Sequence, residues 1–124
     1  MIEVEVVVRV KPTEDPDKVL DAVKKLFPDL EYRVKEGLIV GRGRGIEALR
    51  NFVNVIGREG IAPRTIQLLR ERRRGNSVVI PIDKEVATVG RISYDEEGEM
   101  GPMWLEVRGD VQELEDTIRS LISS

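Results

Sequence analysis

Residues 2–11 decide the fold, and they read IEVEVVVRVK. Hydrophobic side chains occupy every second position of this stretch, from Ile2 to Val10, whereas the positions between them are mostly charged. Strict alternation is typical of a β-strand that buries one face and exposes the other. Antiparallel sheets commonly show this one-sided burial, so we expect residues 2–11 to form a strand of such a sheet.

The rest of the chain carries strand and helix signals in turn. Asp15 and Pro16 form a typical helix start, because aspartate caps a first turn and proline suits the first helical position. We expect helices from Pro16, after Gly45, from Ala62 and from Val111. Further strands are expected at residues 30–35, 38–40, 77–82, 86–94 and 104–108. The predicted order is β-α-β-β-α-α-β-β-β-α in a single domain of residues 1–124, an α+β fold with helices on one face of a mainly antiparallel sheet.

Composition removes several classes of function. The chain has 124 residues and contains neither cysteine nor histidine. Disulfides, thiolate nucleophiles, zinc ribbons and the usual acid–base catalyst near neutral pH are thereby excluded. Acidic residues 95–99 have no recognisable metal-ligand spacing and are expected to form a solvated loop tip. We therefore expect no enzyme activity, no catalytic residues, no metal and no cofactor.

Features of export or membrane insertion are missing from the sequence. No hydrophobic stretch approaches the roughly 20 residues of a membrane-spanning helix. The chain also opens as a strand rather than as a charged and then apolar leader, so we expect a cytoplasmic protein without membrane contact. Few Asn and Gln and many Glu, Arg and Lys are typical of proteins from hot environments.

Arginines are concentrated in the middle of the chain. Residues 42–74 contain nine arginines, no lysine and three acidic residues, a net charge of +6, whereas the remainder carries −9. Guanidinium groups pair with phosphates through two parallel hydrogen bonds and stack on bases. The candidate RNA-binding residues are Arg42, Arg44, Arg50, Arg58, Arg70, Arg72, Arg73 and Arg74. The alternative is a solvated surface whose arginines pair with acidic groups of the same chain or of a partner subunit.

Two parts of this region have specific interpretations. Residues 41–45 read GRGRG between a strand and a helix, where backbone N–H groups could cradle a phosphate. A flexible strand exit is the alternative for this segment. At residues 70–74, attraction to a helix C-terminus accounts for one or two arginines but hardly for four of five. Their mutual repulsion is a cost unless an anion neutralises it.

Aromatic residues are few, with two Phe, two Tyr and one Trp. Four of them fall at hydrophobic-face positions: Tyr32, Phe52, Tyr94 and Trp104. We expect these side chains in the core rather than in a platform on which bases stack.

Residues 12–19, PTEDPDKV, resemble the opening motif of a family of small, functionally uncharacterised archaeal proteins that are generally described as RNA-binding. The resemblance continues at residues 68–73, LLRERR, and at residues 101–103, GPM, and covers nearly the whole chain. It implies a fold like that of the ribosomal protein that binds 5S rRNA, and it brings no catalytic residues. Of the Asn-Lys-Gln-Ala-Ala-like stretch of that family, this chain keeps only Lys84 and Ala87.

The sequence thus predicts a non-catalytic protein whose arginines contact the phosphates of structured RNA, recognised by shape. The alternative is an interaction module. In that case the same basic surface meets an acidic surface, such as residues 95–99 of another copy, in a homodimer or larger assembly. A carboxylate enzyme is the least favoured class, because no paired acids stand at an interpretable spacing.

Overall fold

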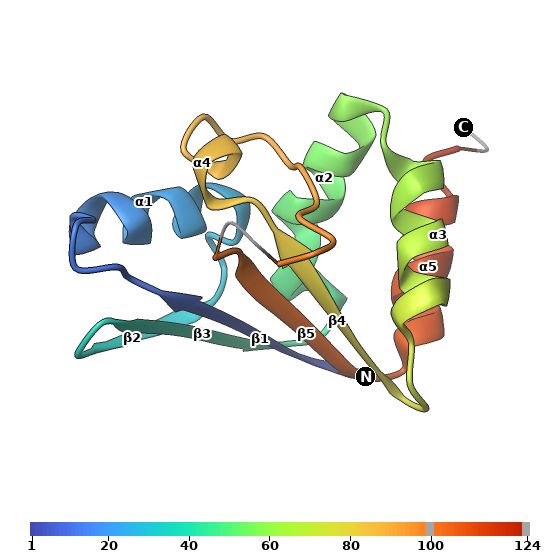
Figure 1. Cartoon of the computed structure of the whole chain (residues 1–124). Coiled ribbons are helices and arrows are strands. Elements are labelled where there is room, and N and C mark those ends of the chain that lie inside the picture. Colours follow the sequence, from blue (N-terminus) through green and yellow to red (C-terminus); the bar gives the residue numbers. More distant parts are fainter. Residues whose placement is uncertain (99–100, 123–124) are drawn as a thin grey trace.

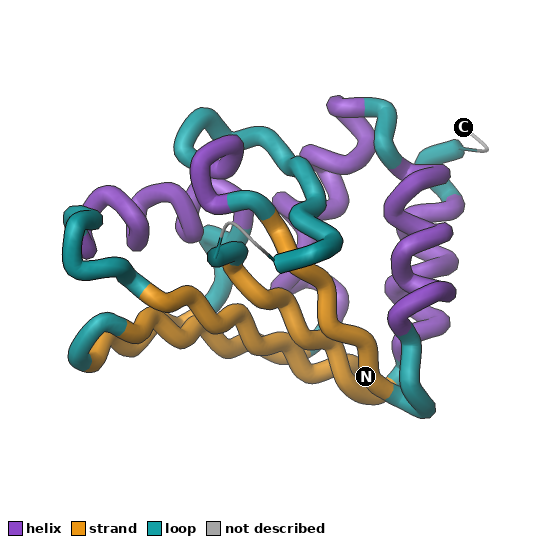
Figure 2. Tube along the Cα trace, in the orientation of Figure 1, coloured by secondary structure: helices purple, strands orange, loops and turns teal. Residues whose placement is uncertain are grey.

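Five strands form one antiparallel sheet in the order β2-β3-β1-β5-β4. The computed structural model describes residues 1–98 and 101–122. The strands are β1 (Ile2–Arg9), β2 (Glu31–Lys35), β3 (Leu38–Arg44), β4 (Ser77–Ile82) and β5 (Met103–Gly109). Figures 1 and 2 show the helices on one side of the sheet, which leaves its other face uncovered. The predicted α+β class and the one-sided sheet are confirmed.

The helical layer is built from short segments. They are α1 (Pro16–Leu26), a 3-10 helix η1 (Ile46–Leu49), α2 (Arg50–Glu59), α3 (Ala62–Arg72), α4 (Lys84–Ala87) and α5 (Val111–Arg119). The predicted start of α1 is confirmed, because the Asp15 side chain accepts a hydrogen bond from the N–H of Asp17. In Figure 1, α1 lies over one end of the sheet, and α3 and α5 stand side by side at the other end.

The core lies between the sheet and the helices. Ile2, Val4, Val6 and Val8 of β1 point into it and are at most 3% exposed. The rings of Phe27 and Phe52 stack there with centroids 5.1 Å apart. Because β1 pairs with β3 on one side and β5 on the other, its alternation determines which residues of both neighbours face the helices.

The predicted strand over residues 86–94 is wrong, and the predicted order of elements is wrong at that point. The Asp83 side chain accepts hydrogen bonds from the N–H groups of Glu85 and Val86 and so caps the short helix α4. The chain then continues as a loop and returns to the sheet at an isolated bridge between Ile82 and Tyr94. Local capping by Asp83 outweighs the weak β pattern of the residues that follow.

Two glycines of the GRGRG segment make room for side chains of the core. A Cβ at Gly41 would lie 2.6 Å from the Tyr32 ring, and a Cβ at Gly43 would lie 2.6 Å from the Leu30 side chain. Tyr32 and Leu30 therefore pack directly on the backbone of β3, which no larger residue at these positions would permit.

The same segment does not form a phosphate cradle or a flexible exit. Gly41 and Gly43 pair with β1, and the N–H of Gly45 donates to the carbonyl of Ile2 at 2.9 Å. These amides are directed at the neighbouring strand rather than at a ligand. Arg42 and Arg44 belong to β3, and their side chains point to the uncovered face.

We expect Gly41→Ala to lower the free energy of unfolding by about 1–3 kcal/mol, because the Tyr32 ring must move away from the added methyl group. Gly57→Ala is the matched control, since a Cβ there would meet Leu121 at an ordinary 3.4 Å. In helix α2 this change should raise stability by up to about 1 kcal/mol. Urea unfolding at neutral pH measures both, and a fully stable Gly41→Ala variant would refute the close packing of Tyr32.

Candidate nucleic-acid interface

Arg42 and Arg44 lie exposed on the uncovered face of the sheet. Arg42 Nε is 2.8 Å from a carboxylate oxygen of Glu5, and Arg44 Nε is 4.0 Å from one of Glu3. The two guanidinium-bearing side chains are 68% and 78% exposed. Exposed ion pairs of this kind contribute little, so a phosphate can compete for both arginines.

The arginines at the end of α3 make different contacts. Arg70 Nε donates to Glu115 of α5 at 3.1 Å. Arg72 is half-buried, and its Nε donates to the carbonyl of Val79 at 2.8 Å. Arg73 donates to the carbonyl of Gly75, and Arg74 donates to the carbonyls of Glu71 and Arg73. Since a guanidinium has five N–H donors, Arg73 and Arg74 retain donors for a ligand.

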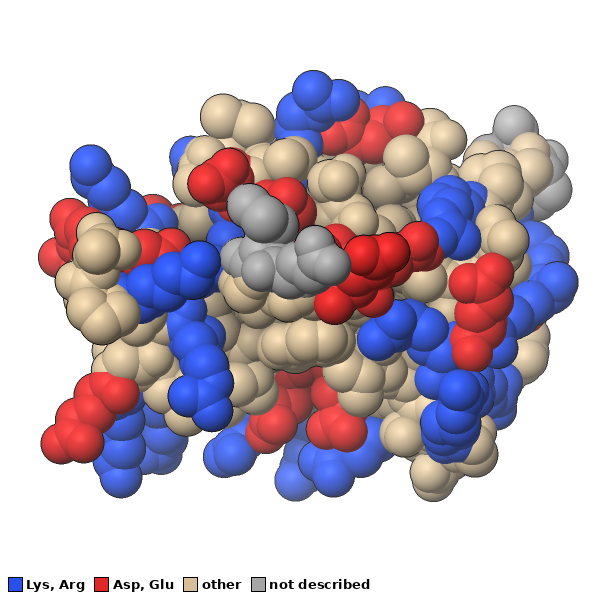
Figure 3. All heavy atoms as spheres, viewed as in Figure 1, with Lys and Arg blue, Asp and Glu red and all other residues tan. Residues whose placement is uncertain are grey.

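The register of the sheet joins these two groups. Arg44, Glu3, Arg108 and Ser77 stand opposite one another in one row across β3, β1, β5 and β4. Ser77 in turn forms a bridge with Arg74 at the α3–β4 turn. We call Arg44, Arg73, Arg74 and Arg108 the basic rim. In Figure 3, basic side chains gather over the lower end of α3 and also lie along the lower border of the molecule, where acidic side chains stand between them; a further acidic group lies near the centre.

Arg108 was not among the predicted residues, although the alternation of β5 places it on the same face as Glu106. Its role could not be predicted, because the sequence of one strand does not show which of its faces the helices leave uncovered.

Two hollows flank the basic rim. One, of about 460 Å³, is lined by Glu71, Arg72, Arg74, Ser77, Val78 and Val79. The other, of about 380 Å³, is lined by Met1, Glu3, Asn76, Arg108 and Gly109. Both open beside the turn that connects α3 to β4, so the surface there is hollowed next to Arg72, Arg74 and Arg108.

Of the two arginines predicted on one stripe of α2, one lies near the basic rim. Arg50 and Arg44 line the same hollow of about 290 Å³ at the start of the helix. Arg58 lies in the last turn of α2, where its guanidinium donates to the carbonyl of Gly90 at 3.4 Å. Figure 1 shows α2 rising away from the sheet, so Arg58 is not brought together with the other candidates.

Trp104 is not in the core, and that prediction is wrong. It lies on the uncovered face, 37% exposed, with Val7 and Pro81 opposite it on the neighbouring strands. The other three residues of that prediction, Tyr32, Phe52 and Tyr94, do face the helices or the core. Phe52 is fully buried, and the hydroxyl of Tyr94 lies 2.7 Å from that of Thr65. Burial raises the pKa of Tyr94 to about 12.

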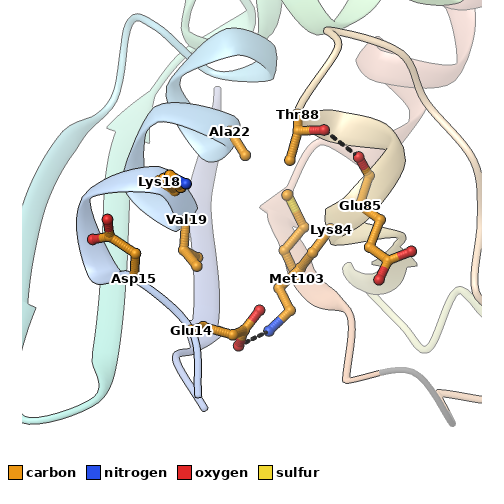
Figure 4. A pocket seen from close by; sticks show the side chains of 9 residues that line it. All are labelled: Glu14, Asp15, Lys18, Val19, Ala22, Lys84, Glu85, Thr88 and Met103. Carbon is orange, nitrogen blue, oxygen red and sulfur yellow. Dashed lines mark hydrogen bonds and ion pairs between the residues drawn. The ribbon is translucent and has the colours of Figure 1, made fainter. Parts of the chain in front are cut away.

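A separate hollow of about 200 Å³ lies between α1 and α4 (Figure 4). Its walls include the apolar side chains of Val19, Ala22 and Met103. At one end Lys84, only 8% exposed, donates to the Glu14 carboxylate at 2.9 Å and also to the carbonyl of Arg9. The ion pair ties the segment before α1 to α4. Glu14 and Lys84, which both lie in segments compared with the family in the sequence, thus have a structural role.

The pKa of the Glu14 carboxyl reflects this contact. Burial alone would raise it, but hydrogen bonds from the Lys11 N–H and from Lys84, with the positive charges of both lysines, hold the pKa below its usual range. Within residues 1–98 and 101–122, no group of three or more metal-ligating side chains stands together. In the same part of the chain, no helix is long and apolar enough to cross a bilayer.

We expect Glu14→Gln to flatten the dependence of stability on acidic pH. A lowered folded-state pKa stabilises the protein above the unfolded value, near 4.5, and this contribution is lost as pH falls through the folded pKa. Urea unfolding from pH 3 to 7 should show a smaller loss in the variant. Glu85→Gln, an exposed residue of the same hollow, should behave as the unmodified chain does. Equal slopes for all three proteins would contradict the ion-pair role.

Known proteins resemble this chain over most of its length. A family model described as RNA binding matches residues 3–111. A UPF0201 protein of Thermococcus onnurineus is 31% identical over 110 residues, which cover 86% of this chain and 82% of that protein. A UPF0201 protein of Methanothermobacter thermautotrophicus is 33% identical over 112 residues, covering 89% and 84%. The chain spans only 33% of a longer UPF0200/UPF0201 protein of Archaeoglobus fulgidus, with 31% identity over 109 residues.

Solved structures agree with the fold. The crystal structure of an uncharacterised UPF0201 protein superposes with a TM-score of 0.78 at 32% identity, covering 86% of this chain and 81% of that one. The structure of a UPF0201 protein from Methanococcus jannaschii gives a TM-score of 0.81 at 22% identity, with 96% and 98% covered. The likeness to the 5S-rRNA-binding ribosomal protein stays a prediction. The chain belongs to the family described as RNA binding, and within it to the archaeal UPF0201 proteins.

Proposed function

We propose that this protein binds structured RNA through the basic rim and the adjoining part of the uncovered sheet face. The observation that carries the proposal is the row Arg44, Glu3, Arg108 and Ser77, which leads from β3 to the arginines at the α3–β4 turn. Guanidinium groups from three separate segments thereby share one concave border. Family membership supports RNA as the polyanion.

The spacing of these groups suits a phosphate backbone. Adjacent strands lie about 4.8 Å apart, so the row of four positions spans roughly 14 Å and reaches more than one phosphate. Glu3 is the one acidic member of the row, and its contact with Arg44 is loose at 4.0 Å. Arg108 Nε has a similarly loose contact, 3.8 Å, with a carboxylate oxygen of Glu106. Both guanidinium groups are therefore available to form two-pronged contacts with phosphate oxygens.

The composition of the face favours structured RNA over single strands. Proteins that bind single strands without sequence preference stack successive bases on several aromatic side chains. Here Trp104 stands between Val7 and Pro81, and the next row toward the basic rim holds the carboxylates of Glu5 and Glu106. One aromatic ring bordered by negative charge is a poor platform for the bases of single-stranded RNA. Contacts to phosphates and sugars of a folded RNA fit this surface better.

The interaction module remains the second candidate function. In it an acidic surface, such as residues 95–99 of another copy, faces the basic surface. Glu96 already forms an ion pair with Arg64 of the same chain, and residue 99 lies outside the described residues. This pairing within the chain lowers the charge left for a partner, so RNA is the better-supported ligand.

The double variant Arg74→Gln with Arg108→Gln should weaken binding to a structured RNA hairpin about tenfold or more at low salt, because two phosphate contacts are lost. The slope of log affinity against log salt should become shallower by about 1 per lost contact. Fluorescence anisotropy between 50 and 300 mM salt, roughly the range over which counterion release dominates, measures both effects.

The matched control is Arg58→Gln with Arg91→Gln, which removes the same charge at the other end of α2, where Arg91 pairs with Glu59. Its affinity should stay within about threefold of the unmodified chain, since general attraction alone is changed. Equal losses in both double variants would leave only nonspecific attraction and would overturn the assignment to the basic rim.

A further inference from the structure

The two outer edges of the sheet are not equivalent. On β4, most of the outward backbone groups are used. Ser77 and Arg74 exchange two hydrogen bonds, of 2.8 and 3.1 Å. The Val79 carbonyl accepts from Arg72, and Pro81 has no N–H while its carbonyl accepts from the Asp95 N–H at 3.1 Å. An edge covered in this way cannot pair with another strand.

The outward groups of β2 can be identified from the ladder. The N–H of Gly45 donates to Ile2, and the N–H of Val10 donates to Gly37. Odd-numbered residues of β3 therefore direct their backbone groups at β1, and its even-numbered residues direct theirs at β2. In β2 it follows that residues 31, 33 and 35 bond to β3, while Tyr32 and Val34 direct N–H and C=O outward.

Nothing in the described part of the chain is bonded to these outward groups of β2. The Val34 side chain beside them is 51% exposed, which makes it one of the large hydrophobic residues left open to solvent. Unpaired backbone next to an exposed β-branched side chain is a ready template for another strand. Figure 1 shows β2 at the border of the sheet opposite β4, and the strand order makes it the outermost strand there.

We propose that β2 pairs antiparallel with β2 of a second copy of this chain, about a twofold axis at Tyr32, so that two five-stranded sheets become one. In this register Glu31 of each copy stands opposite Arg33 of the other on the uncovered face. Tyr32 stands opposite its own counterpart on the helix side, where Val34 becomes covered. Both copies use the same patch, as a twofold interface requires.

The charged side chains of β2 favour an axis at Tyr32 over an axis at either of the next two residues. An axis at Arg33 would place Glu31 opposite Lys35 twice but would also set two guanidinium groups directly opposite each other. An axis at Val34 would place Arg33 opposite Lys35 twice. Within β2, only the axis at Tyr32 gives two opposite-charge pairs without a directly opposed like pair. Directly opposed like charges destabilise a strand pair, whereas opposite charges stabilise it. Charged residues on an edge often prevent pairing, but here Glu31 and Arg33 are placed symmetrically about Tyr32 and are self-complementary. The second copy therefore fits this edge better than a strand of unrelated sequence.

Sedimentation equilibrium of the full chain without nucleic acid tests the proposal. A dimer of twice 14.0 kDa is expected at micromolar concentration. Val34→Pro removes an outward N–H but no bond of the hairpin, so it should raise the dissociation constant about tenfold or more. Val79→Pro makes the same change at the covered edge and should leave the dimer intact. Circular dichroism confirms that each variant is folded.

Charge reversal tests the register itself. Glu31→Arg and Arg33→Glu should each weaken the dimer, because both create like pairs across the axis. The two together should restore it, since the opposed pairs are reversed but complementary. A monomer at about 200 μM unmodified chain, or a dimer that is unaffected by Val34→Pro, overturns the proposal; no rescue by the double reversal overturns the Tyr32 register. The RNA proposal is measured separately and does not depend on these results.

Discussion

The position of β1 in the middle of the sheet is the constraint on which the remaining structure depends. Its alternate residues are apolar on one side and mainly charged or half-exposed on the other. Because strands on both sides pair with it in fixed register, a shift by one residue would turn every buried valine to solvent. The helices must therefore gather on a single face. The opposite face is left for polar contacts, and all of the proposed function takes place there or at its borders.

Local sequence rules predicted most of the fold because the determining interactions are local. The Asp15–Pro16 start of α1 depends on residues within one turn, and the alternation of residues 2–11 on one strand. The wrong prediction at residues 86–94 also concerns a local interaction, because the cap formed by Asp83 outweighs a weak β pattern. The need for glycine at positions 41 and 43 of β3 could not be predicted from the local sequence, because it arises from the Tyr32 and Leu30 side chains that pack on them.

The candidate site was less predictable, since it depends on which face of each strand is uncovered. The arginine-rich segment was visible in the sequence, but its residues divide among different tasks. Arg70 joins α3 to α5 through Glu115, whose pKa is lowered by Arg70 and by further hydrogen bonds and charges around it. Arg72 covers the edge of β4. Trp104 and Arg108 reach the uncovered face through the register of β5 and not through any local motif.

These tasks also explain why the segment uses arginine rather than lysine. At the α3–β4 turn one guanidinium can donate to a main-chain carbonyl with one nitrogen and still present other N–H groups to solvent. Arg72 in this way covers an edge of the sheet, while Arg73 and Arg74 bond to carbonyls of the turn and supply positive charge at the basic rim. Covering β4 leaves β2 as the edge open to pairing. A dimer through β2 would place the two basic rims on one continuous uncovered face, where linked binding of a single RNA molecule gains affinity without any new contact.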